Sequence, residues 1–343
     1  EWVAYHYTLL PLRYLVLGLD VGNEQNPQVV LEPWRRQMGL QYLVINASEF
    51  VPLAGNPPNP RPKDSAATIA HHEFAHRQKG FIRKCTSLLQ DTVRWNTTHP
   101  ITWTAFIDSD EFVTWNPYDE RSEPRSIPPH SWEAKLVEHR KQYVPQWQHN
   151  SQATILDFFQ SQPSLWKEEN GNHTTSCYTV PRLRFGALRN HTCCRDSHTT
   201  TSPKDSSATF PSHWSTLQYF QHAAKHDFAH NKFGKVLLDV SQIPPSVELP
   251  RNIHRPWRPY CGSAAKPLTR SWLRVNHYLG SWERYAQRGD VRRSRAYWEA
   301  TANLTGGHVS CHTTNWISRL QDEWYRRHGN DNVEFQQLLH PSS

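Results

Sequence analysis

The stretch "TAFIDSDEFVTW", residues 104–115, sets an acidic cluster directly after an apolar run. Such a run is typical of a buried strand. Side chains two residues apart in an extended backbone point the same way, so Asp108 and Asp110 can face one ligand together. Paired carboxylates at a strand end suit Mg²⁺ or Mn²⁺, which keep open positions for diphosphate oxygens. We therefore expect a metal site here, with an exposed acidic turn as the alternative.

A β-α-β pattern precedes this stretch. Residues 14–20 form an apolar run that ends in an aspartate, and residues 40–47 form a second apolar run. Residues 29–39, between them, have the pattern of a helix closed by a glycine. A long helix is predicted from about Ser65 to Trp95, just before the acidic stretch. This alternation of strands and helices indicates a parallel sheet with helices on its faces.

We therefore expect an α/β fold. A single domain over residues 1–330 would hold a mainly parallel central sheet flanked by helices, with a loop-rich C-terminal part. Within that part, residues 235–243 contain an expected strand, and a helix is expected near residues 315–327. Residues 331–343 are expected to be a tail.

The net charge and the hydrophobic runs of the sequence limit the kinds of molecule that the protein is expected to bind. The 343 residues carry a formal net charge of +7, spread through the sequence. This charge suits an anionic ligand but does not indicate nucleic-acid binding, and an ordinary basic surface would account for it as well. No apolar run approaches the roughly 18 residues of a membrane span. Since the chain begins inside a structured pattern, we expect a missing N-terminal segment with a signal or membrane anchor.

The cysteine spacing and the glycosylation sequons indicate the cellular compartment in which the protein folds. None of the six cysteines forms a C-x-x-C pair, which disfavours a zinc ribbon or a thioredoxin-like site and leaves disulfides open. Five Asn-x-Ser/Thr sequons occur in the chain. Their density favours passage through the secretory pathway.

Residues 72–76 satisfy the H-E-x-x-H pattern of zinc metalloproteases. At 100° per residue, His72 and His76 are expected on the outer face of the long helix, almost opposite its apolar stripe. Lys79 and Arg83 share that face and would disfavour a Zn²⁺ ion. The extended zinc-binding continuation is absent from the sequence. We therefore expect two histidines on a solvated helix face.

Several blocks together resemble a known family. "WTAFIDSDEF", residues 103–112, and the pattern R-Q-x-x-F-x-x-x-C, residues 77–85, resemble D-x-D glycosyltransferases of the GT-A fold. The resemblance is specifically to glycosyltransferase family 92, also known as the domain-of-unknown-function 23 group. Residues 1–20 resemble the family's opening strand region, residues 253–261 its downstream histidine segment, and residues 275–285 its His-Tyr motif followed by Ser and Glu. The blocks cover most of the expected domain.

The resemblance implies transfer of a sugar from a nucleotide sugar, commonly UDP-galactose in the family, to a glycan hydroxyl with inversion. Asp110 would ligate Mn²⁺ or Mg²⁺ directly, and Asp108 would lie near the ribose and the metal. Arg77 and Gln78 match the family block and are expected to contact the nucleotide sugar. Asp20 would face the base or ribose at the sheet's C-terminal edge, with a turn-forming cap as the alternative.

The resemblance also implies a histidine ligand, because GT-A enzymes often add a C-terminal histidine to the metal. We favour His277, which follows the apolar-flanked "WLRV", and keep His254 as the alternative; a structural, hydrogen-bonded role stays open. Inverting transfer needs a general base. Glu283 lies in a family-like block, although a surface helix position would explain it equally. Residues 177–190 resemble the family's acceptor-side loop but contain no carboxylate, so the base is not placed.

Three hypotheses follow. The leading one is a lumenal, metal-dependent glycosyltransferase domain of the Golgi or secretory pathway, anchored through the missing segment, which takes a nucleotide-sugar donor and a glycan acceptor. A catalytically inactive relative that binds glycans is the second, and a zinc metalloprotease is the third.

Overall fold

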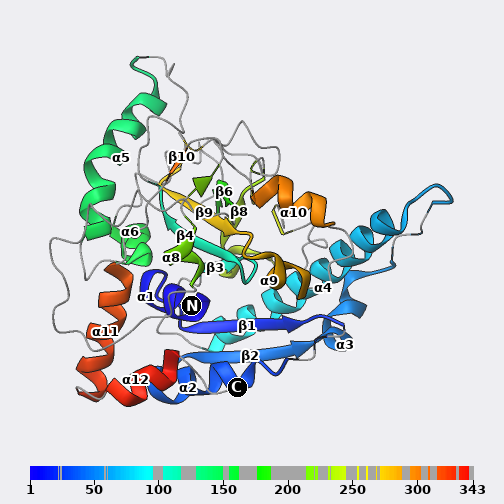
Figure 1. Cartoon of the computed structure of the whole chain (residues 1–343), viewed down its shortest axis with the longest axis horizontal. Coiled ribbons are helices and arrows are strands. Elements are labelled where there is room, and N and C mark those ends of the chain that lie inside the picture. Colours follow the sequence, from blue (N-terminus) through cyan, green and yellow to red (C-terminus); the bar gives the residue numbers. More distant parts are fainter. Residues whose placement is uncertain are drawn as a thin grey trace.

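A computed structural model gives the fold of the chain (Figure 1). It describes residues 1–21, 23, 25–57, 59, 61–95, 103–116, 129–149, 154–161, 176–186, 214–219, 221–222, 231, 233–244, 253–254, 260–261, 268, 271–287, 294–302, 308–309, 315–329 and 332–339.

The expected β-α-β unit is confirmed near the start of the chain. β1 (Tyr14–Leu19) and β2 (Gln41–Asn46) pair in parallel, and α2 (Gln28–Met38) connects them. α2 ends at Gly39, whose φ of 74° lies in the left-handed region that favours glycine. These two strands form a small sheet of their own (Figure 1).

α4 (Ala66–Trp95) is the long helix expected before the acidic stretch. α3 (Ala47–Phe50) and the 3-10 turn η1 (Val51–Ala54) pack against it. At Gly80 of α4, a Cβ atom would overlap the carbonyl oxygen of Phe50. Glycine at this position therefore lets the two segments touch.

One prediction for α4 is wrong. His72 is exposed as expected, but His76 is buried. His76 lies one turn before Gly80, and so on the side of the helix that α3 and η1 cover. Periodicity identifies the apolar side of a helix, but it does not show that a second segment packs on the polar side. The two histidines of the H-E-x-x-H pattern therefore do not share a solvated face.

The other described strands form two sheets, with orders β10-β7-β6-β9-β4 and β3-β8-β5. Pairing within them is antiparallel except between β6 and β9. Their bounds are β3 (Trp103–Phe106), β4 (Glu111–Trp115), β5 (Cys177–Val180), β6 (Arg182–Phe185), β7 (Gln221–His222), β8 (Lys235–Asp239), β9 (Leu273–Tyr278) and β10 (His308–Val309). The α/β class is confirmed, whereas the described strands do not form one mainly parallel central sheet.

Helices surround these sheets (Figure 1). They are α1 (Trp2–Leu9), α5 (Trp132–His149), α6 (Ile155–Ser161), α8 (Ser215–Gln218), the 3-10 turn η3 (Val240–Gln242), α9 (Trp282–Gln287), α10 (Arg295–Ala302), α11 (Asn315–His328) and α12 (Asn332–Leu339). α11 is the helix expected near the end of the chain. No helix in the described part of the chain is both long and apolar enough to cross a membrane.

The main core joins α1 to the C-terminal helices. Tyr5 of α1 packs edge-on against Phe112 of β4 and against Trp316 of α11. Phe335 and Leu338 of α12 belong to the same buried cluster. Part of the segment expected as a tail is therefore a helix with a buried apolar side.

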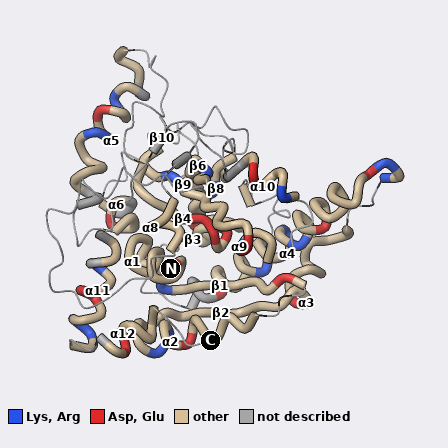
Figure 2. Tube along the Cα trace, in the orientation of Figure 1, with Lys and Arg blue, Asp and Glu red and all other residues tan. Residues whose placement is uncertain are grey.

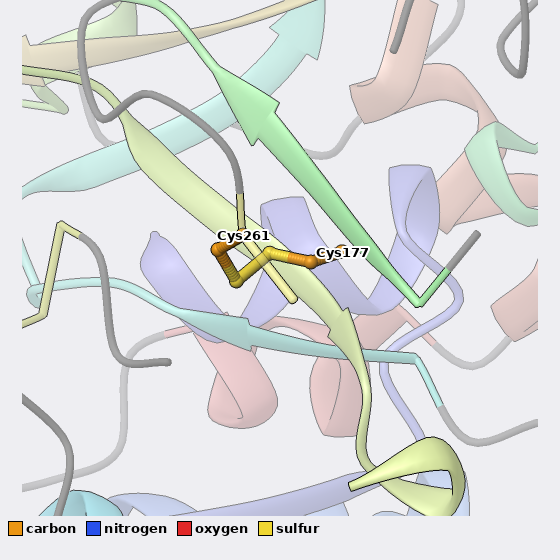
Figure 3. The surroundings of a disulfide bond; sticks show 2 residues. All are labelled: Cys177 and Cys261. Carbon is orange, nitrogen blue, oxygen red and sulfur yellow. A yellow bond between two sulfur atoms is a disulfide. The ribbon is translucent and has the colours of Figure 1, made fainter. Parts of the chain in front are cut away.

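A disulfide joins Cys177 of β5 to Cys261 (Figure 3). This bond agrees with the expectation of a disulfide. Cys85 of α4 is buried and free, and burial raises the pKa of its thiol to about 12.

Candidate functional site

The expected metal-binding sequence forms the turn between β3 and β4 together with the first residue of β4, here called the acidic turn (residues 108–111; Figure 2). The amide of Glu111 donates to the carbonyl oxygen of Asp108 at 3.0 Å, and the amide of Asp108 donates to Oε2 of Glu111 at 3.0 Å. The indole Nε1 of Trp2 donates to the carbonyl oxygens of Asp108 and Glu111, at 3.2 and 2.9 Å. These bonds fix the backbone at both ends of the turn. They therefore also fix the directions in which its side chains point.

Strand register brings His277 to the acidic turn. β4 and β9 pair with Glu111 opposite His277, and the amide of Tyr278 donates to the carbonyl oxygen of Asp110 at 2.9 Å. Nε2 of His277 consequently lies 3.1 Å from Oδ2 of Asp110. These two residues, 167 positions apart in the sequence, are two of the three that we expected at one metal site. The third, Asp108, contacts Lys235 through its Oδ2.

Glu111 is the buried centre of a charged cluster. Its side chain is 0% exposed, with Oε2 2.9 Å from Nζ of Lys235 and Oε1 3.2 Å from Nη1 of Arg182. Burial by itself would raise the pKa of Glu111, but the nearby positive charges, Lys235 foremost, outweigh burial and bring the pKa to about 2. The carboxylate is therefore ionised throughout the neutral range.

Lys235, at the start of β8, connects Glu111 to Asp108. Its Nζ lies 2.9 Å from Oδ2 of Asp108, and the side chain is 1% exposed. Burial lowers the pKa of Lys235, but the carboxylates of Asp108 and Glu111 raise it by more, so the amine stays charged. Asp108 is thus paired with an ammonium group.

His277 meets the cluster through both ring nitrogens. Its Nδ1 lies 3.3 Å from Nη2 of Arg184 and 3.5 Å from Oε1 of Glu111. Arg184 is 1% exposed, and its Nη1 donates to the Tyr297 hydroxyl at 3.0 Å. Burial lowers the pKa of His277 in spite of the neighbouring Asp110 carboxylate. The imidazole is therefore neutral near pH 7, as a metal ligand must be.

Among the residues that the structure describes, the charges of the cluster balance. Its three carboxylates and three cations are Asp108, Asp110, Glu111, Lys235, Arg182 and Arg184. A divalent cation alone would upset this balance, whereas one bound together with a group that carries two negative charges would preserve it.

Asp110 and His277 offer donor types that fit Mn²⁺, namely a carboxylate oxygen and an imidazole nitrogen. Mg²⁺, and Mn²⁺ in similar sites, commonly bind through one or two carboxylates and complete their coordination with water and substrate phosphates. Within the described ranges, no group of three or more His, Cys, Asp or Glu side chains could hold a metal ion. A metal held by Asp110 and His277 would have to take its remaining ligands from other groups.

A second predicted pair also meets. The guanidinium of Arg77 on α4 binds the carboxylate of Asp20 through two hydrogen bonds, from Nε at 2.6 Å and from Nη2 at 3.1 Å. Both side chains are partly exposed, at 27% for Arg77 and 45% for Asp20. Gln78, the next residue of α4, is half-buried. The two polar groups at the carboxyl end of β1 are thus oriented and open to solvent.

His254, the alternative metal ligand, and Glu283, the candidate base, make other contacts. Nδ1 of His254 donates to the carbonyl oxygen of Gly234 at 2.7 Å, and burial together with the charge of Lys235 lowers the pKa of His254 to about 4. Glu283 is exposed in the first turn of α9. Hydrogen bonds from its own amide and from the Ser281 side chain lower the pKa of Glu283, which weakens it as a base.

Comparison of the chain with known protein families, characterised proteins and solved structures finds no match.

Sequence reasoning missed the basic half of the charged cluster. Arg182 and Arg184 lie on β6, and β5 precedes it, so the interpretation of this segment as a loop is wrong for residues 177–180 and 182–185. Residues 187–190 lie outside the described ranges. Two arginines that alternate with apolar residues in a short run were the available signal, because buried cations need buried anions. Lys235, at the head of an apolar run, carried the same signal.

Proposed function

We propose that this chain is a metal-dependent glycosyltransferase that moves a sugar from a nucleotide sugar, a UDP-sugar such as UDP-galactose, to a glycan hydroxyl with inversion. The single observation that carries the proposal is the 3.1 Å contact between Nε2 of His277 and Oδ2 of Asp110. The sequence nominated each residue separately as a ligand of one metal, and only the pairing of β4 with β9 makes them neighbours.

Asp110 and His277 would hold Mn²⁺ or Mg²⁺, which when bound offsets the charge on the departing nucleoside diphosphate. Lys235 keeps the carboxylate of Asp108 in place beside the metal ligands, since it binds both Asp108 and the buried Glu111. Asp20, held by Arg77, would accept hydrogen bonds from the base or ribose of the donor.

The parallel pairing of β1 with β2 and the acidic turn after β3 support the further proposal of a GT-A fold. Its acceptor would be a glycan rather than a nucleic acid. The Cys177–Cys261 disulfide supports a secretory compartment, where disulfides form and persist. We further propose that the domain works in the Golgi lumen.

The test is a screen of nucleotide sugars for transfer or hydrolysis, with Mn²⁺ and with EDTA. We expect turnover that needs Mn²⁺ and falls by at least about a hundredfold in Asp110→Asn, because a metal ligand is lost. Asp322→Asn, the same change at an exposed position of α11, should leave turnover unchanged.

Equal rates in both variants, or a rate that EDTA does not change, would refute the proposal. A folded domain that binds glycans but no nucleoside diphosphate would instead identify the inactive glycan-binding relative. Activity that depends on Zn²⁺ and on His72 would point to the metalloprotease.

A further inference from the structure

Two buried side chains compete for the same nitrogen of His277. Nη2 of Arg184 lies 3.3 Å from Nδ1, and Oε1 of Glu111 lies 3.5 Å from the same atom. Arg184 can only donate a hydrogen bond, and an ionised Glu111 can only accept one. The ring nitrogen cannot satisfy both at once.

Each partner selects a different tautomer of the neutral ring. If Nδ1 accepts from Arg184, the ring proton is on Nε2 and is donated to Oδ2 of Asp110 at 3.1 Å. If Nδ1 donates to Glu111, the lone pair of Nε2 faces Asp110 instead. Only the second tautomer can bind a metal through Nε2, and a carboxylate behind a metal-binding histidine commonly selects it.

We propose that Arg184 and Glu111 act as opposed positioning residues, which set the tautomer of His277 and thereby whether its Nε2 can bind a metal beside Asp110. This inference rests on the proposed metal site. It adds that Arg184 holds the ring in the tautomer that does not bind metal, and that Glu111 accepts the hydrogen bond from Nδ1–H in the tautomer that does.

The surroundings keep both competitors in place. The Tyr297 hydroxyl accepts from Nη1 of Arg184 at 3.0 Å, which directs the other nitrogen of the guanidinium toward the ring. Glu111 is held by Lys235 at 2.9 Å and by Arg182 at 3.2 Å. The change of tautomer removes the proton from Nε2 and adds one at Nδ1, so the charge of the ring stays the same and no large movement of the chain is needed.

The first experiment measures the tautomer directly, by two-bond ¹H–¹⁵N correlation spectra of protein labelled at histidine, with no metal added. The His277 signal is assigned by its loss in His277→Gln. We expect the Nε2–H tautomer in the wild type, a shift toward Nδ1–H in Arg184→Met, and no shift away from Nε2–H in Glu111→Gln.

Two variants control for disturbance of the fold. Arg274→Met removes a different buried arginine, which lies on β9 and binds Asn276. Its side chain lies on the opposite face of that strand from His277. It should leave the tautomer unchanged. Tyr297→Phe removes only the hydroxyl that orients Arg184, and should shift the tautomer in the same direction as Arg184→Met by a smaller amount, even if Arg184→Met does not fold.

The second experiment titrates Mn²⁺ in the presence of UDP and follows free Mn²⁺ by electron paramagnetic resonance. Glu111→Gln should bind Mn²⁺ about tenfold more weakly or worse, as expected for loss of a carboxylate behind a histidine ligand. Arg184→Met should bind it several-fold more tightly. Removal of a positive charge alone would also tighten binding, so the tautomer spectrum decides between the two causes.

A ring proton that stays on Nε2 in both Arg184→Met and Tyr297→Phe overturns the inference, whatever the metal affinities. If the tautomer shifts as stated but no form of the protein binds Mn²⁺ with UDP, the competition for His277 stands and the proposed function fails.

Discussion

At the residue scale, Glu111 shows how a buried carboxylate stays ionised. Removing a carboxylate from water costs several kcal/mol, and only close cations with good geometry offset that cost. Lys235 and Arg182 supply such contacts from two different strands, at 2.9 and 3.2 Å. The sequence marked Asp108 and Asp110 as functional because of their spacing, but the third carboxylate of the turn is the one that organises the cluster.

Glu111 should make the stability of the protein depend on pH. Its pKa is about 2 in the folded chain against an ordinary 4.5, so the stabilisation is complete above pH 4.5 and is lost as the pH falls through about 2. A shift of that size corresponds to about 3 kcal/mol. The contribution of Glu111 to stability is measured by urea unfolding of the wild type and of Glu111→Gln between pH 7 and pH 2.5.

We expect the difference in unfolding free energy between the two proteins to shrink steadily below pH 4.5. A constant difference across this range would show that the charge of Glu111 does not contribute to folding.

At the scale of elements, the sequence predicted those helices and strands that hydrophobic periodicity and end-capping residues indicate. β1, α2, β2, α4 and α11 all occur where apolar runs, a closing glycine or a helical stripe indicated them. Such signals do not predict which distant strands pair with each other. β4 pairs with β9, which is more than 150 residues away, and the residue composition of either strand does not name its partner. The contact of His277 with Asp110 is therefore a property of topology.

Substitution of Gly80 in α4 tests how closely α4 approaches α3. Replacement of glycine by alanine inside a helix normally stabilises by about 1 kcal/mol. Gly80→Ala should instead destabilise the protein by about 2 kcal/mol, because the new Cβ would overlap the Phe50 carbonyl and separate α4 from α3. Thermal and urea unfolding measure the sign of the change.

Gly39→Ala provides the matched control. A Cβ at Gly39 would meet nothing within 4 Å, so its cost comes only from the left-handed φ of 74° and should be about 1 kcal/mol. Stabilisation by Gly80→Ala would mean that α3 and α4 do not touch as described.

At the scale of the whole molecule, four separate parts of the chain build one cluster. The acidic turn, β6, β8 and β9 each contribute charged or imidazole side chains to it. β5, which pairs with β8, is tied by the Cys177–Cys261 disulfide to a segment 84 residues further along the chain. The covalent bond thus constrains the sheet from which Lys235 reaches the acidic turn.

Loss of this disulfide should be costly. Closing a loop of 84 residues restricts the unfolded chain, which on the chain-entropy account stabilises the fold by about 4.6 kcal/mol. The double variant Cys177→Ser with Cys261→Ser should therefore unfold at a clearly lower urea concentration than the wild type. Cys85→Ala, which alters a buried thiol outside any disulfide, should cost about 1 kcal/mol. Equal losses in the two cases would contradict the role given to the bond.

The alignment of Glu111 with His277 across β4 and β9 makes this part of the gene intolerant of insertions and deletions. One codon added or removed within residues 273–277 would move β9 by one position and turn its side chains to the opposite face. Asn276 or Tyr278 would then stand where the imidazole is, and the turn would lose its nitrogen donor although every other residue was unchanged. Substitutions along β9 can be tested one at a time, but its length has to be kept.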